Sequence, residues 1–423
     1  MKKAELLLPA GSVSRMKTAV LYGADAVYAG VPDLSLRANS EFDLQTLAGG
    51  IKYVHDMGKK VYLTLNLFTH NADIPKLPVF LNTVRDLSPD GVIVSDAGVF
   101  DFMRQNAPEI PLHISTQANV CSWLTVDFWQ KQGAKLCVLG REVGFDELTE
   151  IREKCPNIKL EMFIHGAMCM SYSGRCLLSS FMASRSANKG LCAHSCRWKY
   201  KTYYLEEEKR PNEFFPVYED DKGTYIMNSK DLCLMPRLPQ ILSLGIDSLK
   251  VEGRHKSDYY VAMTARVYRK AIDAWYENPN DWHFEPFMDE LDTMQSRGYT
   301  LGFFDGMPEA KDFNYTSTSS TVSGSKICVA MVREHKADGV VLEVKNKINK
   351  GDTIEILSPL QFEPISVKVD KMADFVNGKE LETVSAGTKN QAIIIPYDCF
   401  SGMSVNEVQS LFPALTMART VKI

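Results

Sequence analysis

The sequence predicts a TIM-like (β/α)8 barrel followed by a small C-terminal antiparallel β-barrel. Eight apolar, strand-like runs alternate with helical patterns over the first 250 residues, and from residue 326 short strands alternate with turns instead. Near-continuous apolar strands joined by helices indicate a parallel sheet that is covered on both faces. A doubly wound open sheet is the alternative, but no Gly-rich dinucleotide or phosphate-binding fingerprint follows any of these strands.

The eight predicted strands are short and end in polar residues. They span residues 5–9, 26–30, 61–66, 91–95, 112–116, 136–139, 159–164 and 248–252. Helical patterns lie between most of them, for example at 43–57, 77–87, 123–132 and 146–154. The regular spacing fails between the seventh and eighth strands, where more than eighty residues intervene.

We therefore divide the chain into a barrel at 1–277, an irregular linker region at 278–325 and a C-terminal β-barrel at 326–423. Pro279, Pro286 and Gly298 mark the start of the irregular region, which ends in a Ser/Thr-rich run. A cysteine-bearing insertion at 166–224 interrupts the barrel after its seventh strand.

Four cysteines fall inside twenty-eight residues of this insertion, with gaps of six, fifteen and three residues: Cys169, Cys176, Cys192 and Cys196. The N-terminal sequence resembles neither a signal nor a transit peptide, and no apolar stretch is long enough to span a membrane. We therefore expect a cytoplasmic protein, in which clustered thiols indicate metal or redox chemistry rather than disulfides. Iron–sulfur clusters accept varied cysteine spacing, whereas the six-residue gap fits structural zinc poorly, so zinc is the less favoured occupant.

The composition is that of a globular protein, with 45% hydrophobic and 24% charged residues and a net charge of −4. This charge argues against a protein coated in positive charge, but basic residues do gather beside the cysteines. They form either an electrostatic patch or a solvated rim: Arg175, Arg185, Lys189, Arg197, Lys199 and Lys201.

Polar side chains recur on one face of several predicted strands near their carboxyl ends. Residues two apart on a strand share a face, which groups His113 with Gln117, Glu161 with His165, and Lys250 with Glu252. Charged groups are costly to bury unless they are paired or solvated, so a functional barrel mouth is one explanation. Structural ion pairs, such as Lys250 with Glu252, are the other.

The string from Glu161 to Cys176, EMFIHGAMCMSYSGRC, closely resembles the signature of the collagenase-like unassigned-peptidase family (family U, number 32). Further blocks match along the whole chain: PAGS from Pro9, GADAVYAG from Gly23, LRAN from Leu36, HISTQAN from His113, SKDL from Ser229, KVEGR from Lys250 and RGYTLGFFDG from Arg297. The chain length and the C-terminal barrel are most similar to the branch that hydroxylates wobble uridine in tRNA.

The resemblance implies an oxygen-independent hydroxylase that forms 5-hydroxyuridine, with prephenate or a similar dicarboxylate as hydroxyl donor. It also implies a 4Fe–4S cluster on the four cysteines, tRNA as partner and, as an open question, a second family member. We assign catalytic roles to His113, Glu161, His165, Lys250 and Glu252. Substrate contacts are assigned to polar residues that suit carboxylates or a base: Arg37, Gln117, Asn119, Arg141 and Arg254.

Three alternatives stay open at the level of sequence: a peptidase, a hydroxylase of ribosomal RNA and a hydroxylase of a quinone precursor. The peptidase has little support, because the sequence contains no H-E-x-x-H zinc helix and no G-x-S-x-G nucleophile elbow. A cysteine nucleophile beside His165 or His194 is conceivable, but four clustered thiols exceed what a Cys–His pair needs.

Overall fold

The computed structural model describes most of the chain. The described residues are 2–31, 42–66, 69–168, 230–253, 255–307, 324–387 and 391–422, together with the backbone of four short strands between 204 and 225.

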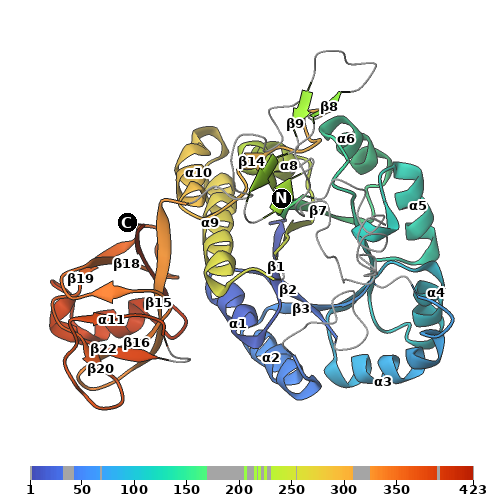
Figure 1. Cartoon of the computed structure of the whole chain (residues 1–423). Helices are drawn as coiled ribbons and strands as arrows, with labels where there is room; N and C mark the ends of the chain where they lie inside the picture. Colours follow the sequence, from blue (N-terminus) through green and yellow to red (C-terminus); the bar gives the residue numbers. More distant parts are fainter. Residues whose placement is uncertain are drawn as a thin grey trace.

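A closed ring of eight parallel strands forms the centre of the molecule (Figure 1). The strands follow one another around the ring, and the last pairs with both the seventh and the first. They are β1 (Glu5–Ala10), β2 (Ala26–Gly30), β3 (Lys60–Leu65), β4 (Gly91–Val94), β5 (Leu112–Ile114), β6 (Leu136–Val138), β7 (Lys159–Ala167) and β13 (Ser248–Val251). The predicted (β/α)8 barrel is confirmed, and the open-sheet alternative is wrong.

Helices surround the ring and most begin at a polar cap. Ser12, Asp43, Asp96, Ser122 and Ser257 each accept a hydrogen bond from the first turn of a helix, as N-cap residues do. The helices are α1 (Val13–Leu21), α2 (Leu44–Asp56), α3 (Leu77–Leu87), α4 (Ala97–Asn106), α5 (Trp123–Gln132), α6 (Phe145–Lys154), α8 (Leu238–Ser243) and α9 (Asp258–Glu277).

The barrel has two cores because side chains alternate between the two faces of each strand. Outward-facing residues such as Leu6, Leu8 and Val27 pack against the helices. A separate inner cluster fills part of the barrel: Leu7, Ala26, Tyr28, Tyr62 and Ile93. Lys250 and His113 lie against this inner cluster, with the ammonium of Lys250 over the Tyr28 ring and His113 beside Tyr62.

The region predicted to be an irregular linker, 278–325, is partly regular and packs on the barrel. It contains η6 (Pro279–Asp281), α10 (Glu285–Asp292) and β14 (Tyr299–Thr300). β14 pairs with β12 (Asp231–Cys233), which in turn runs antiparallel to the end of β7. The guanidinium of Arg297 donates to Asp231 at 2.8 Å, and both residues are buried. The sequence did not predict the pairing of β12 with β14, because the two strands are more than sixty residues apart in the chain.

Residues from 326 onward form a separate antiparallel sheet that curls around its own core. The strand order is β19 (Ile365–Lys368), β18 (Thr353–Leu357), β23 (Met417–Val421), β15 (Lys326–His335), β16 (Gly339–Val344), β22 (Ala392–Pro396) and β20 (Ala373–Asp374). A two-stranded sheet, β17 (Ile348–Asn349) with β21 (Thr383–Val384), and α11 (Val405–Leu411) complete it. The predicted C-terminal β domain is therefore confirmed.

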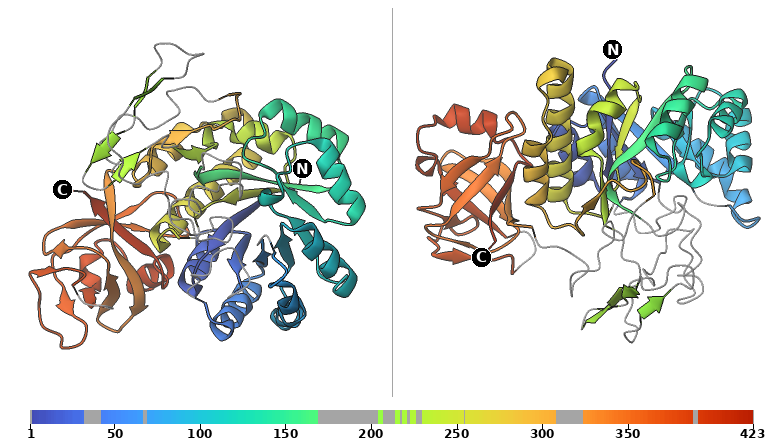
Figure 2. Two further views of the ribbon diagram at one scale, coloured as in Figure 1. Left: turned by 45° about the vertical axis from the view of Figure 1, so that its right-hand side comes forward. Right: turned by 90° about the horizontal axis from the view of Figure 1, so that it is seen from above.

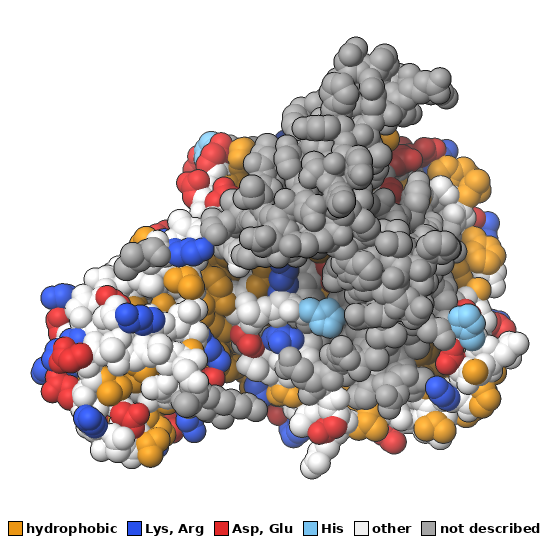
Figure 3. Space-filling view, in the orientation of Figure 1, with side chains coloured by type: hydrophobic (Ala, Val, Ile, Leu, Met, Phe, Trp, Pro, Cys, Tyr) orange, Lys and Arg blue, Asp and Glu red, His pale blue; other side chains and the backbone are white. Residues whose placement is uncertain are grey.

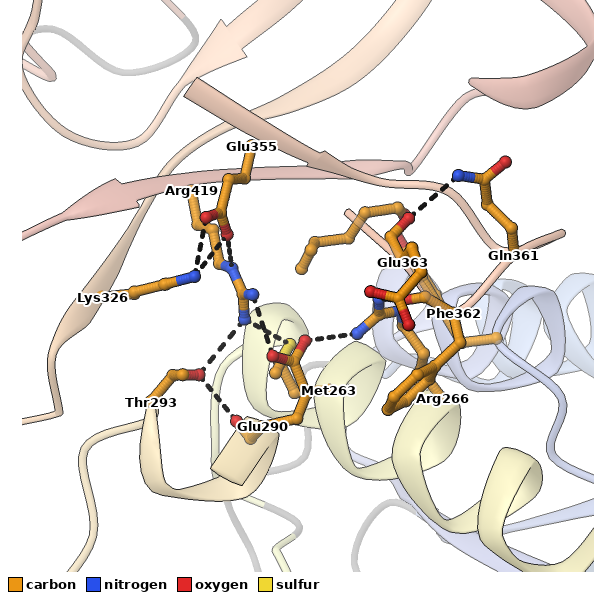
Figure 4. Close-up of polar contacts among 12 residues, drawn as sticks. Met263, Arg266, Glu290, Thr293, Lys326, Glu355, Gln361, Phe362, Glu363 and Arg419 are labelled. Atoms are coloured by element: carbon orange, nitrogen blue, oxygen red, sulfur yellow. Dashed lines mark hydrogen bonds and ion pairs between the residues drawn. The ribbon is translucent and has the colours of Figure 1, made fainter. Parts of the chain in front are cut away.

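A buried ion-pair network joins this sheet to α9 and α10 (Figure 4). Arg419 on β23 is fully buried, and it reaches Glu290 of α10 at 2.9 Å and Glu355 of β18 at 2.7 Å. Glu290 also binds Arg266 of α9. Tyr22, at the end of α1, donates to the carbonyl of Leu357 at 2.7 Å. These contacts fix the C-terminal sheet against one side of the barrel.

The two ends of the barrel are distinct (Figure 2, right). The N terminus lies at the amino end of the strands. The short strands β8 (Tyr204–Glu206) and β9 (Phe214–Pro216) lie beyond the opposite end. Among the helices that the structure describes, none combines the length and the apolar character needed to cross a bilayer.

Candidate active site

Arg141 is the centre of a polar cluster at the carboxyl end of the barrel. It follows β6, and its guanidinium lies 4.1 Å from the centroid of the Phe163 ring on β7. Nη1 donates to the carbonyl of Ala167 at 2.9 Å, and Nη2 lies 3.7 Å from Oε2 of Glu252. We call Arg141, Phe163, Ala167 and Glu252 the Arg141 cluster. It places a cation beside the last residue of β7, two residues before Cys169.

A second polar group follows the neighbouring strands β4 and β5. The hydroxyl of Ser95 donates to Oε1 of Gln117 at 3.2 Å, and Ser115 lies 3.5 Å from the same oxygen. Asn119 ends the short helix η2 (Thr116–Ala118) with a φ of 54°, a left-handed conformation that Asn tolerates. Gln117 and Asn119 thus lie at the predicted end of the barrel, where parallel folds place their chemistry.

Two oxygens at this end are buried and have no hydrogen-bond partner among the described residues. They are Oδ1 of Asn66, directly after β3, and Oε2 of Glu142, directly after Arg141. Burial raises the pKa of the Glu142 carboxyl. Because buried polar atoms are nearly always satisfied, such atoms indicate a place for a ligand or ordered water. In Figure 3, basic side chains are visible on the part of this face that grey atoms leave open.

Lys250 and Glu161 form a buried ion pair inside the barrel. Nζ of Lys250 lies 2.7 Å from Oε1 of Glu161, and Ser248 donates to Oε2 at 2.9 Å. The ammonium also lies 4.5 Å from the Tyr28 ring centroid. The predicted pairing of Lys250 with Glu252 is wrong, because the β7–β13 register brings Glu161 level with Ser248 and leaves Glu252 beyond the strand end. Lys250 and Glu161 are thus engaged with each other.

His165 does not share a strand face with Glu161 and Phe163, so the position that strand alternation predicted for it is wrong. The β7–β13 register shifts between Lys250 and Val251, so His165 instead of residue 164 pairs with Val251. The ring of His165 packs against Tyr268 of α9, whose hydroxyl lies 3.3 Å from Nδ1. Burial lowers its pKa to about 4. His165 is therefore a packed histidine on the helix side of β7.

His113 is also displaced from its predicted position. Its ring packs against Tyr62 in a tilted arrangement, at a centroid distance of 4.8 Å, and it lines a pocket formed by the starts of the strands. Burial, followed by the charge of Lys250, lowers its pKa to about 3. His113 is the middle residue of the three-residue strand β5 and faces the amino-end pocket, so of its predicted group only Ser115 and Gln117 reach the carboxyl end.

The remaining predicted site residues lie outside the residues that the structure describes. They are Arg37, Arg254, Cys169, Cys176, Cys192 and Cys196. No group of three or more His, Cys, Asp or Glu side chains in the described part of the chain is placed to hold a metal. The metal site predicted from the sequence therefore depends on the four cysteines, whose segment starts beside the Arg141 cluster.

Sequence reasoning missed several residues of the barrel interior. Ser248 precedes Lys250 by two residues, so the alternation rule could have placed it on the same strand face as Lys250. Tyr28, Tyr62 and Phe163 supply the aromatic faces over which the cations and His113 lie. No signal in the sequence pairs an aromatic residue on one strand with a cation on another.

Profiles of two families match the chain. That of Peptidase family U32 matches residues 11–314, and that of the Peptidase family U32 C-terminal domain matches residues 326–403. The boundary between the two matches coincides with the boundary between the barrel and the C-terminal sheet.

Curated relatives match along most of their length. A protein named tRNA hydroxylation protein P, from Escherichia coli (strain K12), is 39% identical over 85% of this chain and 87% of its own length. The tRNA hydroxylation protein P1 of Bacillus subtilis (strain 168) is 36% identical, over 90% and 89%. A protein named Collagenase, from Porphyromonas gingivalis (strain ATCC BAA-308 / W83), is 30% identical over 93% and 94%.

Proposed function

The chain belongs to peptidase family U32, and from this premise we propose that it is a tRNA hydroxylase that forms 5-hydroxyuridine at the wobble position without oxygen. The observation that carries the proposal is the Arg141 cluster, which places a cation, an aromatic face and a carboxylate where β7 leads into the four cysteines. The names of the two relatives from Escherichia coli and Bacillus subtilis suggest the substrate class.

The four cysteines suit a 4Fe–4S cluster by the chemistry of their donors, because such clusters are held by four thiolates. When bound, the cluster would supply the one-electron redox chemistry that no ordinary side chain offers. Cys169, Cys176, Cys192 and Cys196 would hold it. Zinc on the same thiolates is the less favoured alternative.

The residues at the carboxyl end would bind and orient the two substrates. A uracil base needs hydrogen-bonding groups on its edge and a flat surface on its face, which Gln117, Asn119 and Phe163 can offer. A dicarboxylate such as prephenate needs cations, and the Arg141 guanidinium suits one carboxylate. Arg37 and Arg254, which lie outside the described residues, are proposed for the other.

Glu252 and Glu142 are the described carboxyl groups that flank Arg141. The partly exposed Glu252 carboxylate orients the guanidinium. Glu142 has a raised pKa because of burial, which keeps it closer to the range in which a carboxyl group can hold a proton. We propose Glu142 as the group that exchanges a proton with the substrate.

Proteolysis is the competing function, since both the family name and one relative carry it. A cysteine peptidase needs a thiol with a lowered pKa. Burial instead raises the pKa of Cys121 to about 11 and that of Cys137 to about 12. The described part of the chain also lacks a set of side chains that would suit a catalytic zinc. These features favour hydroxylation over proteolysis.

Nucleoside analysis of tRNA distinguishes the two functions. A strain that lacks the gene should lose 5-hydroxyuridine and its derivatives from its tRNA, and expression of this chain should restore them. Purified, anaerobically prepared protein should contain iron and sulfide and should not cleave gelatin. Unchanged tRNA in the deletion strain, together with gelatin cleavage by the purified protein, would establish a peptidase instead.

A further inference from the structure

A pocket lies at the amino end of the barrel, opposite the Arg141 cluster. It has a volume of about 280 Å³ and is lined by the starts of β1, β3, β6, β7 and β13, by β5 and by the turns before them. Its inner wall includes Tyr62, His113 and Ser248, each of which is at least nine-tenths buried. Its rim carries five lysines: Lys2, Lys3, Lys59, Lys60 and Lys159.

The carboxylates of this pocket already have cationic partners. Glu5 lies 2.6 Å from Lys60 and also accepts from the hydroxyl of Tyr62 at 2.9 Å. Asp25 pairs with Lys59 at 3.1 Å and with Arg269 at 2.7 Å, and Asp247 pairs with Arg152 at 2.8 Å. Lys3 pairs with Asp273 outside the pocket, so the two rim lysines left without a carboxylate partner among the described residues are Lys2 and Lys159.

His113 is the second, independent indication of a ligand. The residue is 95% buried, it lines the pocket, and its Nδ1 has no hydrogen-bond partner among the described residues. Burial, followed by the charges of Lys250, Lys159 and Lys60, lowers its pKa to about 3, so the imidazole is uncharged at neutral pH. An uncharged ring can supply an N–H group to an anion while the lysines supply the charge.

We propose that this pocket is a second ligand site, separate from the hydroxylation site, and that it binds a small dianion such as a dicarboxylate or a phosphate. The volume lies near the lower limit of known ligand pockets, which suits a small metabolite and is too small for a nucleotide chain. TIM-barrel enzymes react substrates at the carboxyl end, so a ligand at the amino end regulates or stabilises the protein rather than reacting.

Calorimetric titration of the full chain tests the site at constant ionic strength, with malonate and inorganic phosphate as separate probes. We expect one saturable site for at least one probe, and the comparison shows which anion chemistry the pocket prefers. The double variant Lys2→Met/Lys159→Met changes two exposed rim lysines and should weaken binding about tenfold.

His113→Phe keeps an aromatic ring packed against Tyr62 but removes both nitrogens, and it should weaken binding about tenfold as well. The matched control is Lys379→Met, an exposed lysine of the C-terminal domain, which should bind both probes as the unchanged protein does. The proposal is wrong if neither probe saturates below about 10 mM. It is also wrong if the double variant binds normally or if the control weakens binding equally. If His113→Phe does not fold, anion binding by the double variant Lys2→Met/Lys159→Met tests the proposal without it.

Discussion

At the scale of single residues, the structure separates polar groups that the sequence placed together. Alternation along strands grouped Glu161 and Lys250 with other polar residues near the strand ends, and in the structure these two side chains form a buried ion pair inside the barrel. It could not predict that Lys250 pairs with Glu161, because that pairing depends on the register between two strands almost ninety residues apart. It also misplaced His165, because a single shift of register reverses the side on which a residue lies.

Arg141 gives the most direct residue-scale prediction for the proposed function. Arg141→Ala should lower tRNA hydroxylation about tenfold to a hundredfold, because one charge-assisted contact to the substrate is lost. Arg141→Lys should recover part of the activity, since lysine restores the charge but not the planar fork. Hydroxylated nucleosides in tRNA and the iron content of the purified protein are the measurements.

The iron content of Arg141→Ala should equal that of the unchanged protein. The exposed arginine of the Arg104–Asp101 pair provides a control, and Arg104→Ala should leave hydroxylation unchanged. Full hydroxylation by Arg141→Ala would show that Arg141 does not bind the substrate.

The buried His113 predicts a particular pH dependence of stability. Its pKa falls from near 6.5 in the unfolded chain to about 3 in the folded protein, so the unfolded chain binds the proton first. The contribution of the uncharged His113 ring to the free energy of unfolding is fully present above about pH 6.5 and is lost as the pH falls toward 3. Between these pH values, His113 should change the free energy of unfolding by roughly 1 kcal/mol per pH unit. Urea unfolding between pH 7 and 4.5 should show a shallower slope for His113→Phe.

An exposed histidine serves as the comparison for this pH series. His283→Gln should retain the slope of the unchanged protein, because the side chain is 72% exposed. Identical slopes for His113→Phe and the unchanged protein would mean that His113 does not titrate as its burial requires.

At the scale of elements, the eight strands were predictable because each is a short apolar run bounded by turn residues or helix caps. The strands β12 and β14 were not predictable. They have three and two residues, and their partners are distant in sequence. Pairs this short carry no periodicity, so only the packed structure reveals that the blocks around Asp231 and Arg297 meet.

The backbone conformation near the end of β7, just before the cysteine segment, can be tested at Gly166. Its φ is +112°, and a β-carbon at this position would lie 2.3 Å from the carbonyl oxygen of Glu252. Gly166→Ala should cost about 1–3 kcal/mol of unfolding free energy and should disturb the Arg141 cluster. Urea unfolding measures the loss. Gly245→Ala, at a φ of +70° with open space around it, should cost less, and equal losses would contradict the predicted clash.

At the scale of the whole molecule, the sequence predicted both domains but not the way they join. Arg419 lies on a strand of the C-terminal sheet, and nothing near it in sequence indicates partners on α10. Arg419→Met should cost about 3–5 kcal/mol of unfolding free energy, because Glu290 and Glu355 lose a buried partner. Chemical unfolding measures this, and Lys371→Met, which removes an exposed pair with Asp398, should leave the midpoint unchanged. If Arg419→Met and Lys371→Met have the same unfolding midpoint, the network does not stabilise the junction between the barrel and the C-terminal sheet.

We propose that this chain hydroxylates tRNA without oxygen by means of its four cysteines. The most direct test is the 5-hydroxyuridine content of tRNA from a deletion strain grown anaerobically with either the unchanged chain or Cys176→Ala. We expect the unchanged chain to restore the nucleoside and its derivatives in the absence of oxygen, and Cys176→Ala to fail to do so. Restoration by both proteins, or by neither, would contradict it.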